Sequence, residues 1–294
     1  MLSLKGRCGR RGEKFFSYAC LIPSLAGVLI FFVIPFGIVM RYSVINNPVM
    51  KDYVGLDNYK ALVHNTAFRK AARNTAVFSA VSVPLAIVLA LGLAVLLERK
   101  IPGKSAFRTF LLSPLMVPTA SVVLVWQVLF HSHGTINQVA EMFGGEPVDW
   151  LKSSKGQVVI VLMFLWKNIG YNMILFMAAL SNIPRDMIEV AELEGAGAWY
   201  RFVHIKLRYL SPTILFVFIL SLINSFKIFR EVYLLTGNYP YDKLYMLQHF
   251  MNNTFNKLDY QKLSAAAVLF AIVMIVIMAV LMILENIFGK DVEN

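Results

Sequence analysis

Charged side chains are scarce in this sequence. Lysine, arginine, aspartate and glutamate together make up 15% of its 294 residues, whereas a soluble domain carries about 25%. Apolar residues reach 58% of the sequence and the mean hydropathy is +0.63, against roughly 45–50% apolar residues in a soluble domain. These values exclude a soluble globular domain and predict a protein embedded in a lipid bilayer.

The sequence also has few residues that could do chemistry. Its two cysteines, Cys8 and Cys20, lie in a basic leader and the first apolar stretch, where no disulfide is expected. The GKS of "LERKIPGKSAF" resembles the end of a phosphate-binding loop, but Glu98 stands where that motif requires its first glycine. His131 and His133 have no Cys, Asp or Glu at ligand spacing. We therefore expect no catalytic residue, no bound cofactor and no metal in this chain.

Acidic residues are outnumbered, with 17 Asp and Glu against 28 Lys and Arg, which gives a net charge of +11. No aromatic platform for stacking bases accompanies the basic runs. Basic side chains beside anionic lipid headgroups account for such a charge. The expected partner is membrane lipid and not nucleic acid.

Long apolar stretches are what the sequence has in abundance. Six of them approach the roughly 20 residues that cross a bilayer as a helix, and none alternates in polarity as barrel strands do. The first is too long for a signal peptide and lacks a small-residue cleavage site, so we expect it to stay attached. The sequence predicts an all-α polytopic membrane protein whose six-helix domain covers residues 15–287, with spans near 15–41, 76–97, 107–130, 157–180, 213–235 and 263–287.

The distribution of lysine and arginine sets the expected orientation. A basic N-terminus, residues 1–14, precedes the first span, and slightly more basic residues lie on its side of the membrane. We expect both termini and the loop of residues 182–212 in the cytoplasm, with residues 288–294 as the C-terminus. The outer segments 43–75 and 131–156 have apolar residues near helical spacing, which predicts short amphipathic helices at the outer surface.

Among the stretches expected to be helical in the second half of the chain, the loop of residues 182–212 is the most polar. A helix with acidic early turns follows Pro184, and Gly195 and Gly197 end or bend it. A second amphipathic helix is expected from 199 to 210, before Pro212 begins the next span. Small residues let another backbone approach closely, and acidic side chains can pair with a partner's cations. The pattern predicts a helix-turn-helix that docks on a partner or, alternatively, one that only fills the membrane interface.

The block "IPRDMIEVAELEGAGAWYRFVHIKLRYLSPTILFV" resembles the EAA loop of bacterial ATP-binding-cassette (ABC) importer permeases, roughly E-A-A-x-x-x-G-A and then F-x-x-I-x-L-P. Val190 replaces one paired alanine, and Arg208 stands at the usual proline. In such importers this loop is a coupling helix held in a groove of the ATPase subunit. The resemblance implies that the ATPase-docking residues are Glu189, Val190, Ala191, Glu192, Gly195, Ala196 and Phe202.

Stretches such as "VGLDNYKAL", "LLSPLMVPTASVVLVWQVLF" and "NSFKIFREVYLLTGNYP" are similar to the first permease of maltose, glycerol-phosphate and multiple-sugar importers. The resemblance implies the type I ABC importer permease fold and a non-enzymatic subunit of the bacterial inner or plasma membrane. This subunit would form half of the pathway for a mono- or oligosaccharide, or alternatively for glycerol-phosphate or another polyol. The implied partners are a second homologous permease, an ABC ATPase dimer that binds ATP and Mg, and an extracytoplasmic solute-binding protein.

Polar residues inside a span are costly and mark candidate functional sites. Asn168 and Asn172 share one helical face, and hydrogen-bonding groups beside aromatic rings suit a sugar. The predicted pathway residues are Trp166, Asn168, Tyr171, Asn172, Asn224, Lys227, Phe229, Glu231 and Tyr233. Alternatively, Lys227 and Glu231 form an i, i+4 ion pair, and the asparagines join neighbouring helices.

Two rival classes fit the sequence less well. A self-sufficient secondary transporter is disfavoured because we detect no inverted repeat and no acidic ion site at mid-membrane. A membrane-embedded enzyme is disfavoured because no catalytic motif such as HExxH is present.

Overall fold

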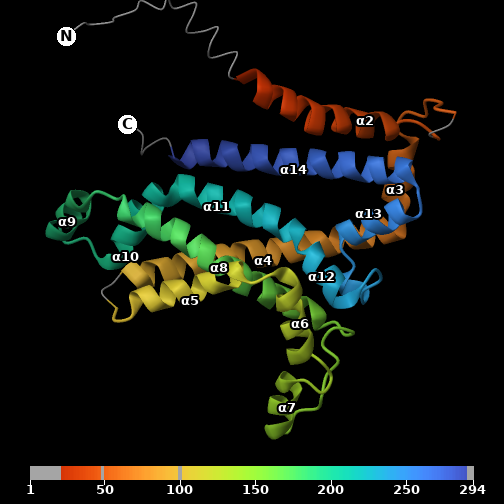
Figure 1. Ribbon diagram of the computed structural model, residues 1–294. Coiled ribbons are helices and arrows are strands. Elements are labelled where there is room, and N and C mark those ends of the chain that lie inside the picture. Colours follow the sequence, from red (N-terminus) through yellow and green to blue (C-terminus); the bar gives the residue numbers. More distant parts are fainter. Residues whose placement is uncertain (1–20, 48–49, 99–100, 290–294) are drawn as a thin grey trace, which may run out of the picture. The chain divides into compact units, whose positions relative to one another are not determined.

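A computed structural model of the chain describes residues 21–47, 50–98 and 101–289 (Figure 1). The expected cytoplasmic N-terminus 1–14, both cysteines and residues 290–294 lie outside this part. The described parts of the chain form two compact units. One belongs to Met1–His64 and Thr254–Ala271, and the other to Asn65–Asn253 and Ile272–Asn294.

The described chain is helical, and its only β-type pairing is one antiparallel bridge between Ile45 and Tyr53. The predicted all-α class is therefore confirmed. Five helices of the described part are long and apolar enough to cross a membrane: Leu21–Tyr42, Thr66–Glu98, Gly156–Ser181, Ala198–Thr236 and Tyr260–Asn286. A bent pair of shorter helices gives six if it counts as one span.

The bent pair replaces the single straight helix that the sequence predicts over 107–130. Helix α5 (Lys104–Met116) and helix α6 (Thr119–Leu129) meet at an angle of 101°. Between them Val117 is extended, with φ −86° and ψ 129°. Pro118 lacks a donor N–H, and its ring disfavours helical angles at the preceding residue. The apolar composition of this stretch masked the break that its proline imposes.

The second span begins earlier than the sequence suggests. Helix α3 (Asp57–His64) is one of the short helices expected in the segment 43–75, but residues from Thr66 onward already belong to α4 (Thr66–Glu98). The Asn65 side chain accepts a 3.0 Å hydrogen bond from the backbone N–H of Phe68. Asn65 thus caps the N-terminus of α4 and separates the two helices.

Helix α8 (Gly156–Ser181) is the central element of the second unit and packs on α4, α5 and α11 (Leu207–Lys227) (Figure 1). The backbones of α5 and α8 cross at Gly170. A Cβ atom there would lie 2.5 Å from the carbonyl carbon of Leu111 and 3.2 Å from the amide nitrogen of Leu112. Only glycine allows this crossing without a shift of α5.

Two apolar clusters fill the second unit along α8. One joins buried residues of α4, α8 and α12 (Phe229–Thr236), where Phe78 and Phe164 meet edge to face with ring centroids 5.6 Å apart. The other joins the remaining halves of α4 and α8 to α11, around Phe176 and Val217. Burial of apolar side chains is the main stabilising term here, together with close helix packing.

In the first unit, the helix Leu21–Tyr42 is followed by the Ile45–Tyr53 bridge and α3. Asn58 of α3 donates from its amide to the carbonyls of Ser43 at 3.0 Å and Ile45 at 2.9 Å. These bonds satisfy backbone carbonyls just past the end of the first helix. Helix α13 (Leu247–Asn256) runs from the second unit into the first, and the last helix, α14 (Tyr260–Gly289), begins in the first unit and continues in the second.

Candidate functional site

The loop predicted to couple to an ATPase folds as a helix with a defined stop. Helix α9 (Arg185–Leu193) begins after Pro184 and carries Asp186 in its first turn. Gly195 has φ +82°, its N–H bonds the Glu192 carbonyl at 3.0 Å, and the Ala196 N–H bonds the Ala191 carbonyl at 2.9 Å. This pair of bonds is a Schellman motif, which needs the left-handed conformation that glycine adopts freely.

The second half of the loop differs from the prediction. Helix α10 (Ala198–Arg201), a π-helical turn η2 (Phe202–Lys206) and α11 form one continuous helix. Pro212 lies inside α11 and does not begin the span. It removes one backbone donor, but the packed face around Leu210 and Val217 holds the helix together. The expected separate amphipathic helix is therefore an extension of the span.

Three contacts brace this loop within the second unit. Glu192 of α9 pairs with Arg201 of α10 at 2.7 Å, and the Tyr209 hydroxyl donates to the sulfur of Met187 at 2.7 Å. Lys206 pairs with Glu98 at the end of α4 at 2.5 Å. The carboxylate of Glu192, one of the predicted docking residues, is thus engaged inside the loop.

The outer face of the loop is uncovered and largely apolar. Leu193 is 88% exposed and Trp199 is 76% exposed, and Val190 and Tyr200 lie with them at the surface. Glu189 is also exposed, and a Cβ atom at Gly195 would meet nothing within 4 Å. An apolar ridge with a free carboxylate and a glycine corner suits close contact with another protein.

The predicted pathway asparagines meet along the contact of α8 with α11. Asn168 donates to the Phe164 carbonyl at 2.8 Å and accepts from the Asn224 amide at 3.0 Å. Asn172 donates to the Ser221 hydroxyl at 2.9 Å. Asn168 and Asn172 are buried and Asn224 is partly buried. We call Asn168, Asn172, Ser221 and Asn224 the amide seam. In this conformation the seam joins two helices of one chain.

Glu231 pairs with a residue that the sequence did not suggest. Its carboxylate is buried and forms an ion pair with Lys167 of α8. The alternative of an intrahelical Lys227–Glu231 pair is wrong, because α11 ends at Lys227 and α12 starts after Ile228. Lys227 itself is exposed.

The aromatic residues predicted to line the pathway lie in two separate places. Phe229 and Tyr233 of α12 lie together, with ring centroids 5.5 Å apart. Trp166 and Tyr171 are exposed on α8, and Trp166 lies 6.3 Å from the Trp126 ring. The structure therefore joins Asn168 to Asn224 and Asn172 to Ser221. It brings Phe229 next to Tyr233 but leaves Trp166 and Tyr171 at the surface.

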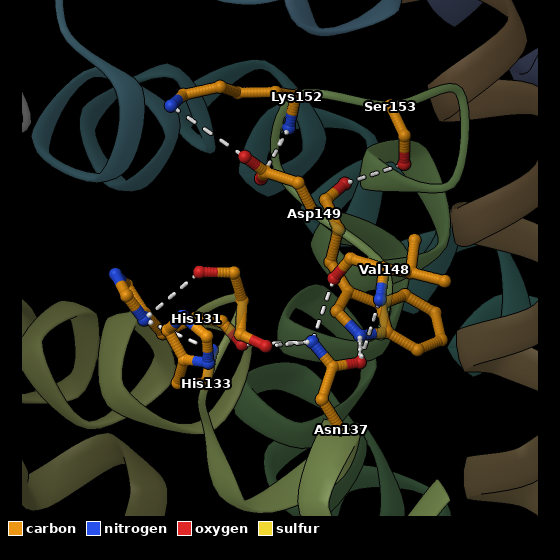
Figure 2. Close-up of polar contacts among 9 residues, drawn as sticks. His131, His133, Asn137, Val148, Asp149, Lys152 and Ser153 are labelled. Atoms are coloured by element: carbon orange, nitrogen blue, oxygen red, sulfur yellow. Dashed lines mark hydrogen bonds and ion pairs between the residues drawn. The ribbon is translucent and has the colours of Figure 1, made fainter. Parts of the chain in front are cut away.

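The segment 131–156, expected at the outer surface, is organised by Asn137, which the sequence did not single out (Figure 2). Asn137 is 1% exposed within α7 (Thr135–Met142) and donates to the carbonyls of Ser132 and Val148, each at 2.8 Å. Its oxygen accepts from the Trp150 indole N–H at 2.9 Å. A polar residue on the buried side of a short amphipathic helix is the only sequence signal. Met142 and Phe143 remain exposed at the end of α7.

His249 of α13 is a second residue that sequence reasoning missed. Its ring is buried, packs edge to face on Phe229 at 4.7 Å, and its Nδ1 accepts from the Met246 N–H at 3.3 Å. Burial lowers the pKa of His249 to about 4, because the charged imidazolium would lose its water. Among the described residues, no three His, Cys, Asp or Glu side chains gather to hold a metal ion.

Comparison with known proteins gives a consistent family. Residues 82–294 match the family model described as "Binding-protein-dependent transport system inner membrane component". The chain is 31% identical over 263 residues to the trehalose/maltose transport system permease protein MalF of Thermococcus litoralis, which covers 87% of this chain and 89% of that protein. It is 32% identical over 219 residues to the lactose transport system permease protein LacF of Rhizobium radiobacter, which covers 72% of each.

Two further relatives extend the comparison. The sn-glycerol-3-phosphate transport system permease protein UgpA of Yersinia enterocolitica is 30% identical over 213 residues, 71% of this chain and 72% of that protein. A crystal structure of a bacterial ABC transporter that imports alginate superimposes with a TM-score of 0.80 at 21% identity, covering 96% of this chain and 97% of that one. This likeness shows that the fold is that of an ABC importer permease.

The exposed helical loop, the several membrane-spanning helices and the matched sequences agree with one another, and the resemblance seen in the sequence is confirmed. The chain belongs to the binding-protein-dependent transport system inner membrane components, and it is a multi-pass permease subunit of an ABC importer rather than an enzyme.

Proposed function

We propose that this permease imports a mono- or oligosaccharide and forms half of the pathway with a second, homologous permease. The relatives that carry trehalose or maltose and lactose in their names support a sugar. Another relative is named for sn-glycerol-3-phosphate transport, so glycerol-phosphate or another polyol is the alternative substrate. The exposed cations Lys227 and Arg230 favour this alternative, because a phosphate requires positive partners.

The observation that carries the proposal is the loop of α9 and α10. This loop exposes an apolar ridge formed by Val190, Leu193, Trp199 and Tyr200. An exposed apolar patch of this kind marks a contact with another protein. We assign it to an ABC ATPase dimer, which carries the ATP and Mg sites. The loop, both termini and the ATPase then lie in the cytoplasm. Glu189, Val190, Ala191, Gly195, Ala196 and Phe202 form the contact, while Glu192 braces the loop from within.

The substrate pathway runs past the amide seam. In the conformation described, Asn168 and Asn172 exchange hydrogen bonds with Asn224 and Ser221. Sugar hydroxyls can replace these amide partners when the two helices separate, so the seam is closed here and opens during transport. Phe229 and Tyr233 provide rings near one end of it, and Trp166, Tyr171 and Lys227 line the path from the exposed faces. Lys167 and Glu231 hold α8 to α12.

We assign the expected outer segments 43–75 and 131–156 to contact with an extracytoplasmic solute-binding protein. The Asn137 hydrogen bonds fix the shape of the second segment (Figure 2). The exposed side chains of Met142 and Phe143 offer it an apolar contact.

The experiment targets Gly195, where a side chain has room within this chain but would intrude on a docked partner. Gly195→Asn adds a side chain that tolerates φ > 0. Gly195→Leu adds bulk and strain. Both should reduce co-purification of the ATPase and substrate-stimulated ATP hydrolysis in vesicles, and Glu189→Lys should do likewise. The matched control is Gly237→Leu, since Gly237 has φ +79° and equally open surroundings, but lies at the far end of the span. Full docking and hydrolysis in both Gly195 variants would reject the assignment.

A further inference from the structure

Two cavities of the second unit meet at the start of α4 and α8. The first holds about 570 Å³ and is lined by Arg69, Lys70, Arg73 and Lys243 together with one acid, Asp242. The second holds about 320 Å³ between the faces of α4 and α8 and is lined almost entirely by apolar side chains. Val77 and Gln157 line both cavities, so the basic pocket adjoins the apolar groove.

The basic pocket has an excess of positive charge. Asp242 forms an ion pair with Lys70. Within the described part of the chain, Arg69, Arg73 and Lys243 have no carboxylate partner, and all three are exposed. Three unneutralised cations around one cavity favour an anionic ligand with several acceptor oxygens.

The walls of the pocket are fixed by hydrogen bonds. The Asn74 amide of α4 donates to the carbonyls of Asp242 at 2.8 Å and Tyr245 at 3.0 Å. Gln157 of α8 donates to the Lys243 carbonyl at 3.4 Å. These bonds tie the short helix η3 (Asp242–Leu244) to both membrane helices, so Lys243 is held opposite Arg69 and Arg73.

The groove continues into the membrane-spanning part of α4. From Val77 to Leu85 it follows eight residues, which is about 12 Å along a helix axis. Its mouth is formed by exposed Val81 of α4 and by exposed Val158 and Leu162 of α8. Because α4 is a membrane span whose cations precede its apolar run, the pocket lies at headgroup level and the groove lies deeper.

We propose that the pocket and the groove together bind one anionic phospholipid, with its phosphate among Arg69, Arg73 and Lys243 and an acyl chain along the groove. A soluble anion would use the cations but leave the groove unfilled. A purely apolar partner would use the groove but leave three cations without a counter-charge. A phospholipid matches both cavities, because its phosphate lies at headgroup level, beside the pocket, and its acyl chain lies deeper, along the groove.

The test uses the full chain in nanodiscs and measures the fraction of spin-labelled lipid immobilised by the protein. Phosphatidylglycerol is the probe, and zwitterionic phosphatidylcholine is the reference. Each cation that contacts the bound headgroup contributes about fivefold to anionic-lipid affinity, so Arg69→Gln with Arg73→Gln should weaken phosphatidylglycerol binding roughly 25-fold. The matched control is Lys152→Gln with Lys155→Gln. These two exposed lysines precede α8 and lie outside the pocket. The control should change binding less than about fivefold.

A second pair of variants tests the groove. Val81→Trp fills its mouth and should abolish acyl-chain immobilisation, whereas Val88→Trp, on an exposed part of α4 outside the groove, should not. Equal phosphatidylglycerol binding by the pocket variant and the parent protein would overturn the proposal. Displacement of the label by inorganic phosphate alone would identify a soluble-anion site instead. Protection of the groove by the second permease, with no bound lipid, would identify a protein interface.

Discussion

The ion pair between Lys167 and Glu231 offers the sharpest test of how the helices pack. Glu231 is 4% exposed, and its carboxylate depends on Lys167 of another helix for charge compensation. Lys167→Met would leave a buried carboxylate alone. Loss of one partner of a buried pair costs about 3–5 kcal/mol. Because the Lys167 side chain is 26% exposed, water can reach this pair, and we expect a cost of about 3 kcal/mol.

A loss of about 3 kcal/mol should lower the apparent melting temperature by roughly 6 °C for a chain of this size. The assay is thermal unfolding of the purified permease in detergent at pH 7. Lys167→Met combined with Glu231→Gln should recover most of the loss, because the remaining amide carries no charge. Such a cycle separates the pair energy from the effect of either side chain alone.

Lys227→Met is the matched control, since Lys227 stands four residues before Glu231 but is exposed and lies on another helix. It should change the melting temperature by less than about 2 °C. An equal loss for Lys227→Met and Lys167→Met would refute the reasoning, as would a double variant no more stable than Lys167→Met alone.

Two further outcomes are expected. Gly170→Ala should destabilise the permease by about 1–3 kcal/mol, because the added Cβ atom clashes with Leu111. The control Gly92→Ala, in an open part of α4, should be neutral or stabilising. Equal melting temperatures of the two variants would contradict the close crossing of α5 and α8. The pKa of His249 is about 4 in the folded protein, below the usual 6.5, so the unfolded chain takes up a proton first as the pH falls. The corresponding stability is fully present above pH 6.5 and is lost progressively toward pH 4, by about 3 kcal/mol in total. His249→Leu should reduce the dependence of the free energy of unfolding on pH between pH 7 and pH 4. An unchanged pH dependence would count against burial of the neutral ring.

Local signals explain what the sequence predicted well. Pro184 starts α9 and Gly195 stops it, because each residue restricts or frees its own backbone angles. Apolar length likewise located most spans. The start of α4 was missed, since the polar turns around Arg69 and Arg73 resemble a loop although their other face carries buried Phe68 and Ala71.

Long-range pairing explains what the sequence did not give. Lys167 and Glu231 are 64 residues apart, and only the packing of α8 on α12 brings them together. The hydrogen bonds of the amide seam and the five hydrogen bonds of the Asn137 side chain depend in the same way on tertiary structure. The break at Val117 and Pro118 is different, because its proline was visible and was outweighed by the apolar character of its neighbours.

The continuous helix from Ala198 to Thr236 has a mechanical consequence. At 39 residues it is about 58 Å long, and it carries Trp199 at one end, Ser221 and Asn224 near its middle and α12 at the other. If it tilts as a stiff rod when the loop is displaced, a rotation of about 5° moves its far end by about 5 Å. The π-helical turn η2, at Phe202–Lys206, lies only a few residues from the loop. A second irregular turn, at Ile228, separates α11 from α12, so the regular part of the helix beyond η2 is α11, which carries Ser221 and Asn224. A displacement applied to the loop end of α11 therefore reaches the amide seam through regular α-helix.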